Sequence, residues 1–338
     1  MGLDARVGCA CLGAALAACG GAGGPVAVPV AARADTDEPQ AGPDAELLGH
    51  DLEATVLEIY SHISLGNFAA YRDSLASEEP VVLFGVRPDD VLVGRQPAGA
   101  ARDRRLFGAM SPTLLSKNLE IHLSPDGSVG WTFDEMSYRV TYRGRTASIP
   151  IRNTSLFVRD FDRWVLVMEH QSYPTAIEDL RAAAAAGRGA QPRRFASRQT
   201  VEPARELVRL VGLLHNAEPR DLGRRVVPDA TTLVLLPDAA RELRGREAAV
   251  GPSLATIFGP NTTVGLRDYR VGEAKNQTIA WMAANLILRT AVNDQQVDIG
   301  LRGTYVFRRT AGEWELVQMH ISAPVGEREL GRRVFGTP

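Results

Sequence analysis

The sequence predicts an α+β fold that is built twice in tandem. Shifting the chain by 150 positions against itself aligns fourteen pairs of identical residues across residues 131–180 without a gap. They are Trp131/Trp281, Arg139/Arg289, Ile149/Ile299, Arg152/Arg302, Thr154/Thr304, Phe157/Phe307, Arg159/Arg309, Trp164/Trp314, Leu166/Leu316, Val167/Val317, His170/His320, Ser172/Ser322, Pro174/Pro324 and Leu180/Leu330. Each copy also places its helical pattern before its strand patterns, which is typical of α+β domains.

An amphipathic helix is expected at the start of each copy. Apolar residues recur at steps of three and four over residues 48–63, behind a Pro-Asp pair, and again over residues 201–214. A short strand is expected next, near 81–84 in the first copy and 232–235 in the second. A further helical stretch follows each of these strands.

Four antiparallel strands are expected in the C-terminal half of each copy. In the first copy we predict them at 117–124, 128–140, 147–159 and 163–172. Polar turn residues separate them, at Pro125-Asp126-Gly127 and at Asp160-Phe161-Asp162. The second copy has matching turns at Lys275-Asn276-Gln277 and Ala311-Gly312-Glu313.

Composition excludes several classes of function. The 338 residues are 45% apolar and 23% charged with a net charge of −2, and they carry no basic stripe, so no nucleic acid partner is expected. All three cysteines lie within the first nineteen residues, so the folded part has neither disulfides nor a thiol nucleophile. The six histidines show no metal-ligand spacing, and no nucleotide-binding or nucleophile-elbow motif occurs. We therefore expect no metal and no cofactor.

The N-terminus resembles a bacterial lipoprotein signal peptide. Residues 1–18 contain an apolar run too short to span a bilayer, and the run ends in Leu16-Ala17-Ala18-Cys19, which resembles a lipobox. The resemblance implies export, lipidation of Cys19 and, because Gly20 follows, the outer membrane. Residues 19–43 are rich in Gly, Ala and Pro and are expected to form a flexible tether. The alternative is an Ala-rich disordered N-terminus or a misassigned start codon.

The predicted organisation places the first domain at 44–181 and the second at 198–332. A linker over 182–197 joins them, beginning as a helix end and continuing through Gly-Arg-Gly and Gln-Pro-Arg-Arg.

A shared motif closes each copy. It reads Arg-x-Thr, then a strand and a turn, then Trp-x-Leu-Val-x-x-His-x-Ser, with its histidines at His170 and His320. This motif resembles the SnoaL-like branch of the nuclear transport factor 2-like superfamily. The resemblance implies a cone, in which a curved sheet wraps against helices around a concave pocket, and it implies frequent back-to-back dimers. It does not imply one function, because the same fold hosts isomerases, cyclases, dehydratases and binding proteins.

The candidate ligand-binding residues come from the strands around this motif. Simple alternation puts Trp164, Leu166, Met168, His170 and Ser172 on one face, where the histidine could act as a general base. The alternative is that tryptophan fills the core while His, Ser, Arg and Thr tie neighbouring strands together. The full set of candidates is Tyr60, Trp131, Glu135, Arg152, His170, Trp281, Asn285, Arg302 and His320.

Catalysis is expected only in the first copy, if at all. Glu135 in an apolar cone could have a raised pKa and act as a base, but the second copy has Asn285 there. Tyr60 could supply a pocket hydroxyl, and residues 200–215 contain no tyrosine. We therefore assign no catalytic residues.

The predicted function is that of a non-enzymatic lipoprotein of the cell envelope, facing the periplasm or the cell surface. It would contact the membrane only through its lipid anchor and would bind a small apolar ligand or a protein partner. Its two domains would form an intramolecular pseudo-dimer through the outer faces of their sheets, with Val167 and Val317 at the contact. The alternatives are an isomerase- or cyclase-like enzyme using the pocket of the first domain, and a purely structural envelope module.

Overall fold

The computed structural model describes residues 43–77, 81–95, 113–142, 145–197, 202–217, 225–239, 241–259 and 261–335. All of them belong to one compact unit, Ala41–Pro338. The predicted signal peptide, Cys19 and nearly all of the tether lie outside the described residues. So does most of the second helical stretch predicted for the first copy.

The first domain is a six-stranded mixed sheet preceded by two helices, as the fold-class prediction required. The helices are α1 (Pro43–Ser64) and α2 (Phe68–Asp73), and the strands are β1 (Val82–Phe84), β2 (Val91–Val93), β3 (Thr113–Leu123), β4 (Val129–Tyr142), β5 (Arg145–Asp160) and β6 (Arg163–Ser172). The strand order is β2-β1-β6-β5-β4-β3, with only β1 and β6 parallel among these neighbours.

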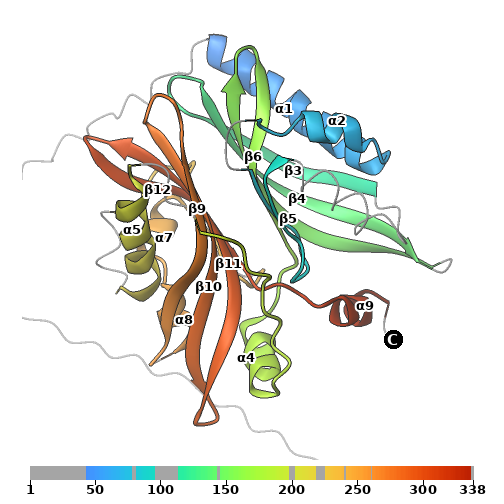
Figure 1. Ribbon diagram of the computed structural model, residues 1–338, viewed down its shortest axis with the longest axis vertical. Helices are drawn as coiled ribbons and strands as arrows, with labels where there is room; N and C mark the ends of the chain where they lie inside the picture. Colours follow the sequence, from blue (N-terminus) through green and yellow to red (C-terminus); the bar gives the residue numbers. More distant parts are fainter. Residues whose placement is uncertain are drawn as a thin grey trace, which may run out of the picture. The chain divides into compact units, whose positions relative to one another are not determined.

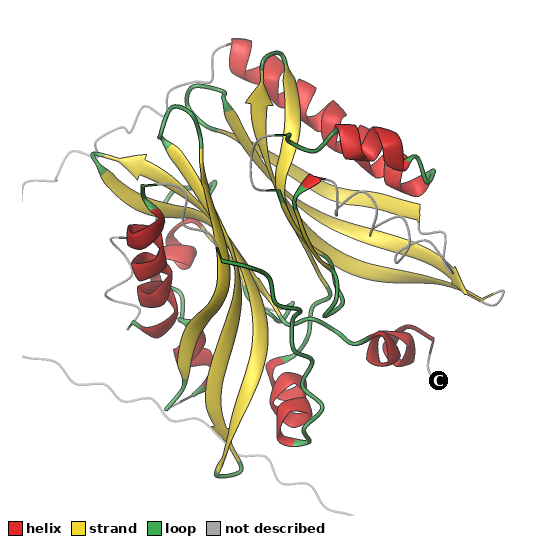
Figure 2. Cartoon of the chain, in the orientation of Figure 1, coloured by secondary structure: helices red, strands yellow, loops and turns green. Residues whose placement is uncertain are grey.

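The second domain repeats this arrangement. Its helices are α5 (Ala204–Asn216), α7 (Gly245–Val250) and α8 (Leu254–Phe258), and its strands are β7 (Leu233–Leu235), β8 (Glu242–Arg244), β9 (Thr263–Glu273), β10 (Ile279–Val292), β11 (Gln295–Thr310) and β12 (Glu313–Ser322). The order β8-β7-β12-β11-β10-β9 matches the first sheet strand for strand. The predicted tandem α+β fold is therefore confirmed (Figure 2).

Helices cover one face of each sheet. In Figure 1, α1 and α2 lie along the first sheet, and α5, α7 and α8 lie along the second. The apolar stripe of α1 is buried at Leu52, Val56, Ile59 and Ile63, because steps of three and four residues return to the same side of a helix. We call the sheet face under these helices the interior face.

A β-bulge divides the last long strand of each sheet. In β6, Leu166 lies opposite Phe157 and Met168 lies opposite Leu156, so Val167 is the extra residue. Val317 is the extra residue in β12. Directly opposed residues share a face, so an extra residue reverses the alternation beyond it.

The bulge corrects the predicted face of the shared motif. Trp164 lies on the interior face and is buried there, whereas His170 and Ser172 lie on the opposite face. The expectation that all three share one face is wrong, because simple alternation does not continue across a bulge.

The faces opposite the helices meet one another along what we call the interdomain seam. One apolar cluster contains Trp131, Leu156 and Val167 of the first domain together with Trp281 and Val317 of the second. A second, smaller cluster joins Phe133 of β4 to two leucines of β7.

The helix after each sheet packs on the other domain. Helix α4 (Ile177–Ala185) buries Ile177 in the core of the second domain, and α9 (Glu327–Phe335) packs Leu330 and Val334 against the core of the first. Equivalent main-chain bonds precede the two helices, from Thr175 N to the Pro237 carbonyl (2.8 Å) and from Val325 N to the Val86 carbonyl (2.9 Å).

Candidate functional site

Two stacked histidines lie at the centre of the seam. The rings of His170 and His320 are 3.9 Å apart between centroids and 18° from parallel. Each ring bonds to a threonine and a serine of the other domain. His170 Nδ1 is 3.0 Å from Thr304 Oγ1 and its Nε2 is 2.7 Å from Ser322 Oγ. The reciprocal pairs, Thr154 Oγ1 with His320 Nδ1 and Ser172 Oγ with His320 Nε2, have the same distances.

Burial keeps both histidines neutral. Neither ring is exposed, so desolvation lowers the pKa of His170 and of His320 well below the usual value. The nearby guanidinium groups lower the pKa of both rings further, Arg302 and Arg152 acting on His170 and Arg152 on His320. A neutral imidazole has one donor and one acceptor nitrogen, and two hydroxyl partners satisfy both. These rings therefore join the two sheets, and they do not face the interior of either domain.

Two buried arginines complete the symmetry of the seam. Arg152 donates to the carbonyls of Leu236 (2.7 Å) and Asp238 (3.0 Å) in the second domain. Arg302 donates to the carbonyls of Gly85 (2.5 Å) and Pro88 (2.6 Å) in the first. Burial lowers the pKa of each guanidinium to about 10, so both remain charged at neutral pH.

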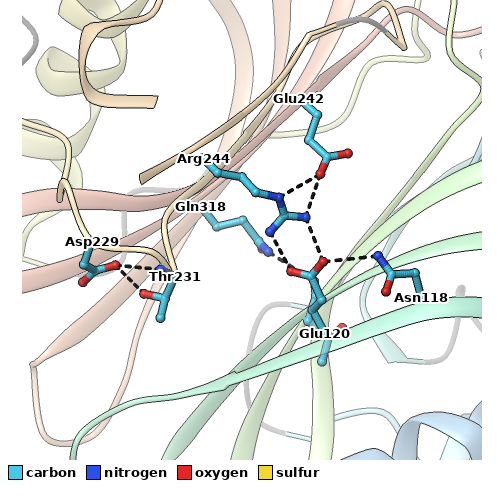
Figure 3. Close-up of polar contacts among 8 residues, drawn as sticks. Asn118, Glu120, Asp229, Thr231, Glu242, Arg244 and Gln318 are labelled. Atoms are coloured by element: carbon cyan, nitrogen blue, oxygen red, sulfur yellow. Dashed lines mark hydrogen bonds and ion pairs between the residues drawn. The ribbon is translucent and has the colours of Figure 1, made fainter. Parts of the chain in front are cut away.

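An ion-pair cluster lies where β8 meets β3 (Figure 3). Arg244 of β8 forms a bidentate pair with Glu120 of β3, at 2.7 and 2.8 Å, and a further bond of 2.6 Å to Glu242. The guanidinium also lies over the Phe133 ring, 5.6 Å from its centroid. The ion pair between Arg244 and Glu120 is partly exposed, so it contributes little to stability. Its main effect is on how the two domains are positioned.

The structure places most of the predicted site residues on the seam side of the sheets. Trp131 and Trp281 are buried in the seam cluster. Asn285 donates to the Arg193 carbonyl (2.9 Å) and to Asp268 Oδ2 (3.1 Å). Glu135 lies opposite Arg152 in the register and is exposed, so the expected apolar surroundings of this carboxylate are not found. Only Tyr60 of the predicted set reaches the interior face.

Tyr60 belongs to a polar network inside the first domain that the sequence predictions missed. Its hydroxyl accepts from Asn153 Nδ2 (3.1 Å), which also lies 3.3 Å from Ser155 Oγ. Beside it, Gln171 Nε2 donates to Glu169 Oε1 (2.6 Å), and the Tyr138 hydroxyl donates to Gln171 Oε1. All of these side chains are buried.

Asp134 also lies on this face, directly opposite Asn153. Its Oδ1 accepts from the main-chain N–H groups of Lys117 (3.3 Å) and Asn118 (3.2 Å), at the bulge of β3. Burial raises the pKa of Asp134 above its usual value. Hydrogen bonds from the Ser116 hydroxyl, from the main chain of Asn118 and Lys117 and from the Tyr60 hydroxyl offset part of that rise. Burial, and then the charge of Asp134, raises the pKa of Tyr60 well above 10.

Three buried oxygen atoms on this face have no hydrogen-bond partner among the described residues. They are Thr132 Oγ1, Asp134 Oδ2 and Asn153 Oδ1. Thr132 and Asp134 are two residues apart on β4, and Asn153 faces Asp134 from β5, so the three are neighbours. An unsatisfied buried polar group costs about 1–3 kcal/mol, so three together indicate a place where another molecule can bond. We call these three residues the acceptor patch.

The interior face of the second domain is apolar at the same positions. The acceptor patch is replaced by Met282, Ala284 and Gly303, and Met319 and Ile321 stand where Glu169 and Gln171 lie. Tyr305 fills the space beside Gly303 and bonds through its hydroxyl to His215 Nε2 (2.6 Å). The two domains therefore share a fold and a seam but differ in their interiors.

This difference is visible in the sequence once the faces are known. Subtracting 150 from each residue number pairs the polar set of the first domain with apolar residues of the second. Asp134 and Asn153 could therefore have been found from the sequence, as polar residues of the first copy whose equivalents in the second copy are apolar. The identical pairs are found on both faces: His170/His320 and Arg152/Arg302 lie at the seam, whereas Trp164 lies on the interior face.

The described part of the chain has a groove elsewhere, but neither a metal-binding cluster nor a membrane-spanning helix. A groove of about 160 Å³ lies between the domains and includes Ser128, Arg159 and Lys275 in its lining, but none of the candidate residues. No group of His, Cys, Asp or Glu in the described ranges could hold a metal ion. None of the helices within those ranges has the length and apolar character needed to cross a membrane.

Comparison with known proteins shows which protein family the chain matches. The SnoaL-like domain family matches the chain twice, over residues 52–176 and 229–326, which together make up more than half of it. No curated protein matches the chain.

Similar solved structures each cover about two fifths of the chain. A nuclear transport factor 2-like superfamily protein from Salmonella enterica is 14% identical, covers 39% of this chain and 94% of its own, and has a TM-score of 0.35. A proposed dehydratase of the same family from Streptomyces avermitilis is 13% identical, with 39% and 99% covered and a TM-score of 0.34. A similar protein with a cystatin-like fold from Novosphingobium aromaticivorans is 13% identical, with 39% and 86% covered and a TM-score of 0.33.

Proposed function

The chain belongs to the SnoaL-like domain family, with one member domain in each half, and from this premise we propose that only the first domain binds a ligand. The second domain serves as its structural partner. The observation that carries the proposal is the acceptor patch, where three buried oxygens lack partners on one face of one domain. This is a polar surface, so the ligand is small and polar, in contrast to the small apolar ligand or protein partner expected from the sequence.

The second domain supports the division of roles by contrast. Its interior is filled by apolar side chains and by the Tyr305–His215 pair. Burial lowers the pKa of His215 to about 3, so this pair stays neutral inside an apolar core. A filled, neutral interior suits packing. The only buried side-chain atom of the Tyr305–His215 pair without a partner among the described residues is His215 Nδ1, whereas the acceptor patch has three such oxygens together.

Thr132→Val is expected to weaken ligand binding and to stabilise the fold. The substitution keeps the side-chain shape and removes the unpartnered hydroxyl, so unfolding should require about 1 kcal/mol more. Binding is measured in the full chain through the side-chain amide NMR signals of Asn153, during titration with n-butanol, n-butylamine and butyrate. We expect at least one probe to shift these signals in the parent and to bind more weakly to the variant.

Thr278→Val provides the matched control, because Thr278 is exposed in the turn before β10. It should change neither binding nor stability. Equal probe affinities in the parent and in Thr132→Val would count against a site at the acceptor patch. So would a titration in which no probe moves the Asn153 signals of the parent.

We also propose that the two domains act as an intramolecular pseudo-dimer. The reciprocal bonds of His170 and His320, of Arg152 and Arg302, and of the segments before α4 and α9 support it. Each of these contacts in one direction has an equivalent in the other, as expected for a two-fold contact between copies of one domain.

The proposed location is the cell envelope, with the chain held at the outer membrane by a lipid on Cys19. The support is the order of signals in the sequence: an apolar run, then Leu16-Ala17-Ala18-Cys19, then a Gly- and Pro-rich tether. Such a tether would let the domains act away from the membrane surface.

Cys19→Ser is expected to abolish lipid attachment. The diacylglycerol transfer that precedes cleavage requires a thiol. The variant should therefore keep its signal peptide and carry no lipid. Intact mass measurement of protein expressed in a bacterial host checks this. Cys11→Ser is the control and should mature normally; normal maturation of Cys19→Ser would contradict the lipoprotein proposal.

Proton transfer is a second candidate function of the same site. It is favoured by the position of Asp134, whose pKa is raised by burial and which lies beside Tyr60. A carboxyl group and a phenol inside a water-poor cone could move a proton on a bound molecule. If the protein binds a molecule without converting it, the first function is supported. If the protein converts the bound molecule to an isomer and Asp134→Asn loses this activity, the second function is supported.

A further inference from the structure

We infer that the acceptor patch takes the ammonium group of a small primary amine. The inference rests on the proposed function and names the class of ligand. It is carried by three adjacent oxygens, Asp134 Oδ2, Asn153 Oδ1 and Thr132 Oγ1, that are buried and without partners among the described residues.

The donors in and beside the patch are the Asn153 amide and the hydroxyls of Thr132, Tyr60 and Ser116, of which the last two bond to Asp134. Asn153 Nδ2 is occupied by Tyr60 and Ser155, which leaves the carbonyl oxygen of the amide as its free atom. Asp134 in its ionised form is an acceptor only, and its Oδ1 is taken by two main-chain N–H groups. None of these neutral donors supplies a positive charge, and Asp134 Oδ2, Asn153 Oδ1 and Thr132 Oγ1 remain able to accept. A ligand that completes the patch must therefore bring positive charge as well as several donors.

An alkylammonium group meets this need in number and in charge. It carries three N–H donors and no acceptor, so it can bond to three oxygens at once. Its positive charge also compensates the carboxylate of Asp134, which would otherwise be costly to keep ionised in a buried position. An alcohol offers a single donor, and a carboxylate offers none and would be repelled by Asp134.

The surroundings of the patch agree with a cationic ligand. The strand positions beside Asp134 on this face hold Thr132, Met136, Leu119 and Asn153, none of which is basic. Arg152, the nearest arginine in sequence to Asn153, points to the seam and donates to main-chain carbonyls there.

The test compares n-butylammonium with n-butanol, which has the same alkyl chain and no charge. Both are titrated into the full chain at neutral pH while the side-chain amide signals of Asn153 are followed by NMR. The amide of Asn285, on the seam of the second domain, serves as an internal reference that should not move. We expect n-butylammonium to bind at least about tenfold more tightly than n-butanol, since a charged hydrogen bond contributes more than a neutral one.

Asp134→Asn removes the charge and keeps the size of the side chain and its Oδ1 acceptor. It should weaken n-butylammonium binding about tenfold or more and leave n-butanol binding nearly unchanged. Glu135→Gln is the matched control, because Glu135 is the adjacent carboxylate and is exposed, and its loss should have no effect. In the parent, the affinity for n-butylammonium should also fall as the pH is lowered and Asp134 takes up a proton.

The outcomes separate the two proposals. If n-butanol shifts the Asn153 signals as strongly as n-butylammonium, or if Asp134→Asn binds n-butylammonium as the parent does, the amine inference is overturned while a polar ligand site remains. If no probe shifts the Asn153 signals, both the inference and the proposed function are overturned.

Discussion

Val317→Glu is expected to destabilise both domains together by several kcal/mol. Val317 is the bulge residue of β12, is fully buried, and packs in one apolar cluster with residues of the first domain. A carboxylate at this position would lie in the seam without a counter-charge, and burying an unpaired charge is strongly unfavourable. Because the seam is shared, the first domain should lose stability although the substitution lies in the second.

Chemical denaturation followed separately in each domain measures this effect. Fluorine-labelled tryptophan gives one NMR signal for each of Trp131, Trp164, Trp281 and Trp314, so the unfolding of the two domains can be monitored independently. Val250→Glu is the matched control, because Val250 is 60% exposed in the same domain and should tolerate the change. If the first-domain signals of Val317→Glu kept the parent midpoint, the two domains would be independent and the pseudo-dimer proposal would be wrong.

Lowering the pH from 7.5 to 5.5 is expected to destabilise the protein through its buried histidines. In the unfolded chain a histidine has a pKa near 6.5, whereas burial lowers the pKa of His170, His320 and His215 in the fold. The unfolded state therefore binds more protons below about pH 6.5. Stability is fully present above that pH and falls as the pH decreases, by at most about 1.4 kcal/mol per pH unit for each histidine.

The double substitution His170→Gln/His320→Gln should reduce this pH dependence by about half and leave the shares of His215 and His122, whose pKa burial also lowers. The quantity to compare is the slope of the unfolding free energy against pH. Glutamine does not fill the space of the stacked rings, so it can lower stability equally at every pH without changing that slope. His50→Gln is the control, because His50 is exposed on α1 and should leave the slope unchanged. A slope unaffected by the double substitution would mean that the seam histidines are not kept neutral by the fold.

Positions that are identical in the two copies and positions that differ have different structural roles. The identical pairs His170/His320 and Arg152/Arg302 lie at the seam and bond reciprocally. A two-fold contact requires the same chemistry from both partners, so identity is explained by the contact alone. Residues that differ between copies, such as Asp134 and Ala284, lie on the interior faces, where the first domain has Asp134 and Asn153 and the second has Ala284 and Gly303. A search for function therefore belongs at the divergent positions.

The sequence alone predicted the first helix and the long strands of each domain but not the short strands β2 and β8. The apolar steps of three and four residues predicted α1 and α5, and the turn residues predicted the ends of β3 to β6 to within a few positions. Local signals suffice there because a helix stripe, a strand or a tight turn is specified by residues close in the chain. The same local signals identified Trp164 as a core residue and Tyr60 as an interior one.

Only the tertiary structure decided which face each strand residue occupies. A single extra residue at Val167 and at Val317 turned His170 and His320 from the interior to the seam, and no local pattern marks a bulge. Asp134 and Glu135 are adjacent carboxylates on opposite faces of β4. Asp134 is buried opposite Asn153, whereas Glu135 is exposed. Which of the two becomes part of a site depends on the pairing register with β3 and β5. Register is a long-range property, because it is fixed by strands and helices that meet only when the chain has folded.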